Sequence, residues 1–308
     1  MTGAQDKGAD DDRYLISAWC AQNLVRAQFP RWGDLRVSEV ADQGWDNRTF
    51  RLGRTMLLRF PTADRYVPQV GKEHRWLPFW AKHLDVDIPL PLEKGAPGND
   101  YPWPWSVYRW VPGTSANHPA GQTSVSLAEN AAAFLHALQR IPAESAPLAG
   151  AENFFRGGPV NHYDRETREC LSRLRTVLDV VPAVRIWEQA LSAPYGGPPV
   201  WVHGDLTPAN LLVRAGKLVG VIDFGQCAVG DPACDLTMAW TFFQGPAQAA
   251  FLAAAPADEA MWCRARGWAL WKGLVQIRDA QTGSQSHMAA MATIFRLVED
   301  KKTPGSCG

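Results

Sequence analysis

Two carboxylates and one carboxamide lie close together in the second half of this sequence. Asp205 and Asn210 belong to the stretch WVHGDLTPAN (residues 201–210), and Asp223 belongs to VIDFG (residues 221–225). Transfer of the terminal phosphoryl group of a nucleotide to a hydroxyl depends mainly on positioning and on neutralisation of negative charge by magnesium. One carboxylate near the acceptor hydroxyl and two oxygen ligands for the metal form a minimal set, and a neutral amide can be one of these ligands. These residue types at this spacing predict a phosphoryl-transfer centre.

Short apolar segments are predicted to position the first two side chains. Residues 200–202 predict a β-strand, and Thr207 and Pro208 keep the loop that follows from becoming helical. The carboxylate of Asp205 can therefore face a cleft. Asn210 ends this loop just before the next apolar run, so its side-chain oxygen can turn back toward the same cleft.

A β-hairpin is predicted to carry the third side chain. Residues 211–213 and 218–222 are apolar runs separated by a predicted turn at residues 216–217. Asp223 follows the second run, and Gly225 gives the backbone the freedom for the turn that presents it.

The sequences HGDLTPAN and IDFG resemble the motifs of the aminoglycoside phosphotransferase family, relatives of the protein kinases that act on small molecules. The resemblance covers most of the chain. It implies an α+β, two-lobed, protein-kinase-like fold, with a small antiparallel-sheet N-lobe and a larger helical C-lobe. It also implies that Asp205 is the catalytic base and that Asn210 and Asp223 hold magnesium. His203 matches the histidine of the motif, which implies that it organises the loop and does not transfer a proton in the reaction.

The stretch GDPACDLTMAW (residues 230–240) resembles the continuation of these motifs, which implies structural, loop-organising roles for Asp231 and Asp235. Asp231 before Pro232 is also typical of a helix start, with an N-cap residue followed by proline. The alternative is that both motifs are ordinary turns, since a single HGD tripeptide occurs in many proteins without chemistry. Two motifs at this separation, each after an apolar strand, favour the catalytic interpretation.

Three strands are predicted upstream, at residues 35–40, 48–53 and 55–60, which are short, turn-bounded and rich in strand formers. They predict an antiparallel meander that covers the nucleotide. In the loop between the first two strands, Gly44 could let backbone amides approach a phosphate group, and the resemblance implies nucleotide contacts from Gly44 to Asn47. Without the resemblance, an ordinary hairpin turn explains this loop.

Arg59 occupies the position at which kinase-like folds carry a lysine that holds the nucleotide phosphates, so the chain departs here from the usual pattern. Arginine keeps the positive charge and adds a planar fork suited to phosphate oxygens, but it is bulkier. Glu73 is its expected ionic partner, on a segment with helical spacing in which Pro78 ends the turn or opens another helix. The alternatives are a solvent-exposed arginine and a surface helix acid.

A strand at residues 105–110 is predicted to be the last of the small lobe, and Pro112 and Gly113 end it abruptly. In kinase-like folds the adenine packs between the lobes and bonds to the backbone of this hinge. The resemblance therefore implies that backbone amides here contact the adenine. The candidates are Tyr108, Arg109, Trp110 and Val111.

Helices are predicted to follow the hinge. The clearest covers residues 126–140, with a capping box of Ser126 and Glu129 and an apolar stripe along one face. Further helical runs are predicted at residues 165–180, 183–191 and 232–298. The chain then divides into an N-lobe at 13–111, a C-lobe at 112–300, and loose tails at 1–12 and 301–308.

The composition is that of a globular chain of 308 residues, 46% hydrophobic, with 31 basic and 31 acidic residues. The balanced charge and the lack of a Lys/Arg cluster exclude a general nucleic-acid partner. No apolar segment is long enough to cross a bilayer, and the acidic residues 6–12 do not resemble a signal peptide, so a cytoplasmic chain without a membrane partner is expected. Six scattered cysteines without CxxC spacing indicate free thiols.

The acceptor is the part of the function that the sequence specifies least. In the resembling family, acidic side chains of the helical lobe hold the ammonium groups of aminoglycosides, and Trp262, Trp268 and Trp271 could wall a pocket or pack in the core. The acidic candidates, which fit solvated helix faces equally well, are Asp258, Glu259, Asp279, Glu299 and Asp300. No substrate-binding residue is assigned.

The resemblance implies a magnesium-requiring phosphotransferase that uses ATP or GTP and a small hydroxylated acceptor, of the aminoglycoside or another antibiotic type. A metabolite kinase of the choline, homoserine or methylthioribose type is the alternative within this class. A nucleotide-binding pseudokinase is the alternative outside it, because position 59 holds an arginine. The sequence indicates no oligomeric state.

Overall fold

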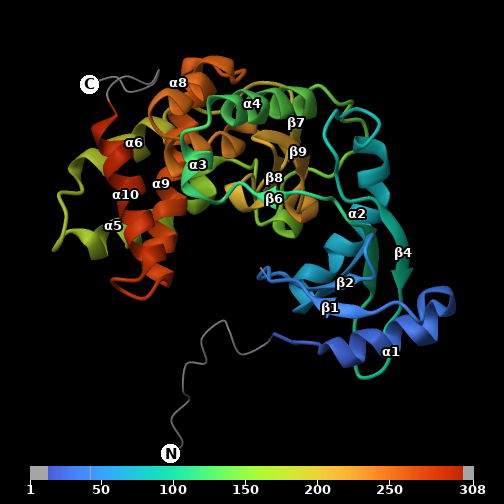
Figure 1. Cartoon of the computed structure of the whole chain (residues 1–308). Coiled ribbons are helices and arrows are strands. Elements are labelled where there is room, and N and C mark those ends of the chain that lie inside the picture. The colour runs from blue at the N-terminus through green and yellow to red at the C-terminus, as the bar shows by residue number, and fades with distance from the viewer. Residues whose placement is uncertain (1–12, 42, 301–308) are drawn as a thin grey trace, which may run out of the picture. The chain divides into compact units, whose positions relative to one another are not determined.

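A computed structural model describes residues 13–41 and 43–300, which form two compact units (Figure 1). The first unit holds the described residues up to Lys82 together with Ile88–Val111. The second unit holds His83–Asp87 and the described residues from Pro112 onward. The tails predicted at 1–12 and 301–308 lie outside the described residues.

The segment His83–Asp87 belongs to the second unit, although it falls inside the N-lobe predicted at 13–111. The reason is a backbone pairing that no local sequence pattern reveals. Asp87 donates its N–H to Val219 O and accepts from Val221 N–H, each at 3.0 Å.

The first unit is built on a five-stranded antiparallel sheet in the order β1-β2-β3-β5-β4. The strands are β1 (Val37–Glu39), β2 (Asn47–Leu52), β3 (Met56–Pro61), β4 (Pro91–Gly95) and β5 (Trp105–Arg109). The meander predicted for the first three strands is confirmed, since β2 pairs antiparallel with both β1 and β3. The register places Thr49 opposite Arg59.

Side chains alternate between the two faces of the sheet along β3 and β5. Helix α1 packs on one face and helix α2 on the other. Leu58 and Phe60, both fully buried, pack in the cluster that includes Leu24 of helix α1. Arg59 and Tyr108 point to the opposite face, where they contact helix α2. The helical elements of the unit are α1 (Ala18–Gln28), α2 (Val67–Trp80) and the 3₁₀ turns Pro30–Trp32 and Asp64–Tyr66.

Neither α1 nor β4 is among the predicted elements. A helix-start signal for α1 does exist, because Ser17 caps the helix by accepting from Cys20 N–H at 3.2 Å. The prediction for Pro78 is wrong, since α2 continues through it to Trp80. A proline so close to the end of a helix removes a backbone donor without breaking the turns before it.

Two small sheets carry the loops of the second unit. One pairs β7 (Val200–Val202) with β10 (Ala228–Gly230), and the other has the order β6-β8-β9, formed by Thr114–Ser115, Leu211–Arg214 and Lys217–Val221. The β8–β9 hairpin turns at Ala215 and Gly216 and not at residues 216–217. Their φ angles of 49° and 76° are both positive, as a type I′ turn requires.

Helices form most of the remainder of the second unit (Figure 1). They are α3 (Pro119–Gln122), α4 (Val125–Gln139), α5 (Asp164–Leu174), α6 (Val181–Leu191), α7 (Met238–Thr241), α8 (Gly245–Ala254), α9 (Glu259–Asp279) and α10 (Gln285–Glu299). The long helix α9 packs against α5, α6, α7 and α10. The predicted α+β class, with an antiparallel sheet in the first unit and mainly helices in the second, is thereby confirmed.

Helix α4 begins earlier than predicted, and the capping box of Ser126 and Glu129 is wrong. Ser124 is the N-cap residue, and its Oγ accepts from Leu127 N–H at 3.2 Å. Ser124 has an extended backbone, whereas Ser126 already lies within the helix. The predicted apolar stripe is present, with Phe134 among its buried members.

No helix within residues 13–41 and 43–300 combines the length and the apolar character that crossing a bilayer would require.

Candidate active site

The loop that carries Asp205 leaves β7 through a glycine with left-handed backbone. Gly204 has a φ of +80°, and a Cβ atom there would lie 2.6 Å from Gln226 O and 3.1 Å from Arg156 Cβ. Only glycine fits this position without displacing backbone. The side chain of Asp205 keeps 32% of its surface exposed, so a small molecule can reach the carboxylate.

A buried carboxylate holds the start of this loop. Asp235 is 1% exposed and accepts hydrogen bonds from the N–H groups of His203 at 2.6 Å and Gly204 at 2.8 Å. Burial raises the pKa of Asp235, and the electrostatic interaction with His203 together with the two backbone hydrogen bonds opposes that change. The carboxylate thus satisfies two backbone donors that would otherwise be buried unpaired.

His203 is fully buried next to the rings of Phe134 and Phe224, and both of its ring nitrogens are engaged. Nδ1 accepts from Asp205 N–H at 3.3 Å, so Nε2 carries the proton and donates to Ile222 O at 3.1 Å. A histidine held in one tautomer by two backbone partners fixes the loop and has no nitrogen to offer a substrate.

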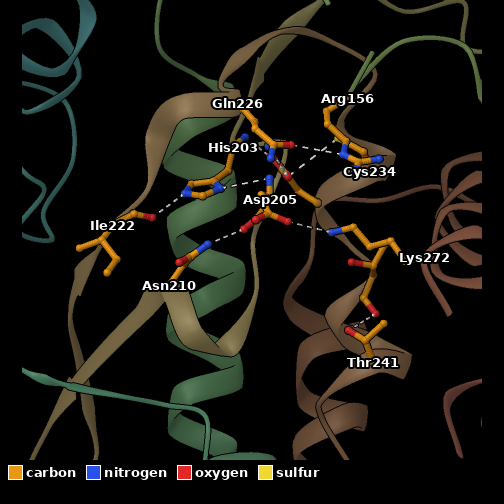
Figure 2. A network of polar contacts seen from close by, with 12 residues as sticks. Arg156, His203, Asp205, Asn210, Ile222, Gln226, Cys234, Thr241 and Lys272 are labelled. Atoms are coloured by element: carbon orange, nitrogen blue, oxygen red, sulfur yellow. Dashed lines mark hydrogen bonds and ion pairs between the residues drawn. The ribbon is translucent and has the colours of Figure 1, made fainter. Parts of the chain in front are cut away.

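The backbone of Ile222 connects the loop that carries Asp205 and Asn210 to the segment that carries Asp223. Figure 2 shows Ile222, His203, Asp205 and Asn210 in this network. Its carbonyl accepts from His203, and its N–H donates to Asn210 O at 3.0 Å. Asn210 Nδ2 in turn donates to the backbone carbonyl of Asp205 at 2.9 Å. Asp205 and Asn210 therefore belong to one hydrogen-bonded arrangement, and Asp223 directly follows the residue that links them.

Asp223 itself makes the turn after β9. Its φ of 65° and ψ of 64° place it in the left-handed region, which a residue other than glycine adopts at a cost of about 1–2 kcal/mol. The prediction that Gly225 supplies the required freedom is wrong, because Gly225 is not among the glycines with positive φ. Backbone strain at this aspartate is the kind of feature that accumulates at functional sites.

Asn210 and Asp223 have the donor atoms that magnesium prefers. The amide nitrogen of Asn210 is used by Asp205 O, which leaves Oδ1 as the acceptor atom, and Asp223 supplies carboxylate oxygens. Within the described residues no group of three or more His, Cys, Asp and Glu side chains could hold a metal. Magnesium does not need such a group, since it keeps waters and phosphate oxygens as ligands. The two residues therefore fit the ion, and their role as ligands stays a prediction.

Lys272 of α9 lies beside Asp205, and no sequence pattern indicated it. Its Nζ is 3.5 Å from Asp205 Oδ1, and its side chain is only 13% exposed (Figure 2). The two residues are 67 positions apart. Because a single lysine on a long helix has no distinctive spacing, only the tertiary contact identifies it.

Asp231 forms a buried ion pair with Arg264, which the sequence did not predict. Arg264 Nε and Nη2 donate to Asp231 Oδ2 and Oδ1 at 2.7 Å and 3.1 Å. Both side chains are at most 5% exposed. Asp231 also caps the 3₁₀ turn Pro232–Asp235 by accepting from Ala233 N–H at 3.1 Å. The predicted helix start is therefore present, as a short turn.

In the first unit, Arg59 and Glu73 form a buried ion pair. Arg59 Nη1 donates to Glu73 Oε1 at 2.7 Å, and the two residues are 8% and 2% exposed. The solvent-exposed alternatives for both residues are therefore wrong. Glu73 also accepts from the hydroxyl of Tyr108, and burial, with the charge of Glu73, raises the pKa of that hydroxyl. A phosphate-binding role for Arg59 stays a prediction.

The amides predicted to contact the adenine are mostly used by the sheet. The N–H groups of Arg109 and Trp110 each donate to a backbone carbonyl at 2.8 Å, and Tyr108 lies inside β5 between two neighbouring strands. This part of the prediction needs correction, because a strand interior pairs its donors before any ligand arrives. An adenine contact from Val111, the last residue of the first unit, stays a prediction.

The loop before β2 is held by a side chain and not by glycine conformation. Gln43 Oε1 accepts from Thr49 N–H at 3.0 Å, and its amide group donates to backbone carbonyls at both ends of the loop. Gly44 is exposed and has no left-handed φ, and Asn47 is 6% exposed as the first residue of β2. Nucleotide contacts from Gly44 and Asn47 stay a prediction.

The acceptor candidates on the carboxy-terminal helices have structural roles. Trp262, Trp268 and Trp271 are at most 5% exposed, so they pack in the core. Three of the acids have protein partners: Asp258 accepts from Met261 N–H at the start of α9, Asp279 pairs with Arg278, and Asp300 accepts from Trp240 Nε1.

An antiparallel-sheet unit together with a helical unit that carries the HGD loop and the IDFG hairpin defines the class of kinase-like phosphotransferases. A model of the phosphotransferase enzyme family matches residues 37–274, which is most of the chain. The chain belongs to this family.

Individual relatives agree with this assignment. An aminoglycoside 3'-phosphotransferase of Escherichia coli is 25% identical over 148 residues, which are 44% of this chain and 51% of that protein. The match thus spans about half of that relative. The solved GDP complex of aminoglycoside 2'-phosphotransferase-IIIa covers 92% of this chain and 99% of its own, at 18% identity and a TM-score of 0.67. The macrolide 2'-phosphotransferase MphH of Brachybacterium faecium covers 90% and 97%, at 22% identity and a TM-score of 0.56.

Proposed function

We propose that this protein transfers the terminal phosphoryl group of ATP or GTP to a hydroxyl of a small molecule. The observation that carries the proposal is the hydrogen-bonded network of His203, Asp205, Asn210 and the backbone of Ile222, the residue directly before Asp223. The solved complexes of similar chains with GDP, ADP and ATP support a nucleoside triphosphate as co-substrate.

Asp205 is the base in this proposal. Its partly exposed carboxylate accepts the proton of the acceptor hydroxyl and orients that oxygen toward the phosphoryl group. His203 and Asp235 keep the loop in place and take no part in proton transfer. Asn210 Oδ1 and the carboxylate of Asp223 hold magnesium, which neutralises charge on the phosphate oxygens when it is bound.

Arg59 provides the positive charge for the nucleotide phosphates in this proposal, positioned by Glu73. The buried ion pair at 2.7 Å supports such a role, because it fixes the position of a charged group suited to phosphate oxygens. A nucleotide-binding pseudokinase is the competing function, motivated by the arginine itself.

The names of similar proteins indicate which classes of acceptor to test first. Solved structures of similar chains include complexes with the aminoglycosides kanamycin, gentamicin and streptomycin. Macrolide phosphotransferases are also similar in fold. An antibiotic is therefore the first kind of acceptor to test and a hydroxylated metabolite the second. Unchanged sensitivity of an expressing strain to all aminoglycosides and macrolides tested would remove the antibiotic role and leave the kinase proposal standing.

The direct test is magnesium-dependent consumption of ATP and GTP with a panel of hydroxylated amines, sugars, hydroxy acids and antibiotics. Asp205→Ala should lower the rate about 10² to 10⁴-fold, since it removes the general base. Asp179→Ala, at an exposed aspartate of the same unit, is the matched control. Equal rates in the wild type and Asp205→Ala would remove Asp205 from the mechanism. Nucleotide binding without turnover across the panel would favour the pseudokinase.

A further inference from the structure

Two cationic side chains flank the loop of Asp205 on the side of α9. Lys272 approaches the carboxylate directly, with Nζ 3.5 Å from Oδ1. Arg156 approaches the same loop from a different segment, since its Cβ lies 3.1 Å from the position of a Cβ on Gly204. Both cations act on the buried thiol of Cys234, whose pKa is raised by burial and by two nearby aspartates and is partly lowered by Lys272 and Arg156. Figure 2 shows both side chains around Asp205.

The segment that presents Arg156 is strained. Phe154 and Phe155, the two residues before it, have φ angles of 53° and 55°, and Gly157 after it has a φ of 79°. Left-handed backbone costs about 1–2 kcal/mol for each residue with a Cβ atom. Two consecutive residues of this kind persist only where the surrounding structure holds them.

Asn153 supplies much of that support. Its Nδ2 donates to Arg156 O at 2.7 Å and to Gln226 O at 3.1 Å, and its Oδ1 accepts from Gly150 N–H at 2.8 Å. The side chain is 2% exposed. The strained segment is therefore tied to the residue that lies opposite Gly204, and Arg156 is held beside the loop of Asp205.

The guanidinium of Arg156 is only partly satisfied by protein groups. Its Nε donates to Gln226 Oε1 at 3.3 Å, and its carbon atom lies 4.3 Å from the ring centre of Trp271. Its Nη1 is buried and has no hydrogen-bond partner among the residues that the structure describes. A buried charged donor without an acceptor is costly. An acceptor group on a ligand would remove that cost.

Two carboxylates on this side of the unit, which could otherwise hold the ammonium groups of a ligand, are already paired with an arginine. Glu166 accepts from Trp271 Nε1 at 2.7 Å and pairs with Arg278 at 2.6 Å. Asp279 pairs with the same arginine. These carboxylates are neutralised within the protein, whereas Lys272 and Arg156 keep donors that no described carboxylate other than Asp205 engages at short range.

We propose that Arg156 and Lys272 form an acceptor subsite that selects hydroxylated compounds carrying an acidic group, a carboxylate or a phosphate, and disfavours polycationic acceptors. The inference rests on the proposed phosphoryl transfer at Asp205. An anionic group held by the two cations places a hydroxyl of the same molecule next to the Asp205 carboxylate. A polycation brings like charges against two partly buried ones, which disfavours the wrong partner.

The test uses three pyranoses that differ in charge: D-glucuronate, D-glucose and D-glucosamine at pH 6.5, with kanamycin as a polycation. Binding is measured by ligand-observed NMR, which needs no turnover, and magnesium-dependent transfer is measured in parallel. Glucuronate should bind at least about 10-fold more tightly than glucosamine, since hydrogen bonds to charged groups are worth about 10- to 100-fold in affinity. Lys272→Met and Arg156→Met should each reduce this ratio, and Lys272→Glu should reverse it.

Arg165→Met is the matched control, because it also removes one cation. Arg165 lies on α5, and its side chain is 92% exposed. Arg156→Gln, which removes the charge and keeps a polar side chain, replaces Arg156→Met if that variant fails to fold. Equal binding of the three sugars, undetectable binding of glucuronate, or a preference for glucosamine or kanamycin overturns the inference. A ratio that survives in both cation variants overturns it as well. If the protein prefers glucuronate but consumes no nucleotide, the proposed phosphoryl transfer is wrong and the proposed subsite is supported.

Discussion

Asp235 accepts the backbone N–H of His203 at 2.6 Å, although the two residues are 32 positions apart in the chain. The same carboxylate accepts the N–H of Gly204 at 2.8 Å. This contact sets the backbone from which the side chain of Asp205 projects. On the loop it involves only backbone N–H groups and no side chain.

Asp235→Asn should therefore damage both stability and activity. An amide can accept one of the two N–H groups, but its own NH₂ meets the other donor and leaves it buried without a partner. The expected loss is about 1–3 kcal/mol of unfolding free energy, with a drop in phosphoryl transfer of at least about 10-fold. Urea unfolding and steady-state rates measure these effects. Asp179→Asn, at an exposed aspartate whose Oδ1 accepts from Val181 N–H, is the control. Equal behaviour of the two variants would contradict the assigned role.

Gly204→Ala and Gly71→Ala should change stability in opposite directions. At Gly204, a Cβ combines a φ of +80° with an approach of 2.6 Å to Gln226 O, so alanine should destabilise by more than about 2 kcal/mol and reduce activity. At Gly71, inside α2, a Cβ meets nothing within 4 Å. Alanine there should stabilise by about 0.5–1 kcal/mol. Thermal unfolding of both variants is the measurement, and a stable, active Gly204→Ala protein would show that the loop tolerates a different path.

The ion pair of Arg264 and Asp231 should show strong coupling. Arg264→Met leaves a buried carboxylate without its partner and should cost about 3–5 kcal/mol. Asp231→Asn keeps the cap on Ala233 N–H while it removes the charge. The double variant should therefore be more stable than Arg264→Met alone. A double-mutant cycle by urea denaturation measures this coupling, and additive single effects would mean that the pair contributes no net interaction.

His74 should make the first unit less stable in mild acid. Burial lowers the pKa of His74, Lys94 lowers it further, and Glu93 opposes the shift. A base whose pKa is lowered on folding stabilises the protein above its unfolded pKa of about 6.5, and this contribution is lost as pH falls through the lower folded pKa. The ring is partly exposed, so solvent screening limits the expected change to about 0.5 kcal/mol.

The variant His74→Gln tests this expectation, because glutamine can keep a hydrogen bond to Ser106 Oγ, which lies 3.0 Å from His74 Nε2. Unfolding free energies at pH 7.5 and pH 5.5 should differ less in the variant than in the wild type. A variant with the same pH dependence as the wild type would assign the titration to other groups.

Local pattern was sufficient for much of the fold. The β2–β3 meander, the β8–β9 hairpin and the stripe of α4 were predictable because alternation and helical spacing are properties of neighbouring residues. The errors were also local in origin. The cap of α4 was placed at Ser126 although Ser124 has the extended backbone, and the turn after β9 was attributed to Gly225 although Asp223 adopts the left-handed conformation.

The sequence by itself determined the three oxygen-bearing side chains and the strands beside them, because these residues lie within nineteen positions of one another along two motifs. Only the tertiary structure decided what surrounds them. Lys272 reaches Asp205 across 67 positions, Arg156 reaches Gln226 across 70, and Arg264 reaches Asp231 across 33. Such contacts depend on how separate elements pack against one another, and neither the spacing nor the propensity of a single charged residue encodes its partner.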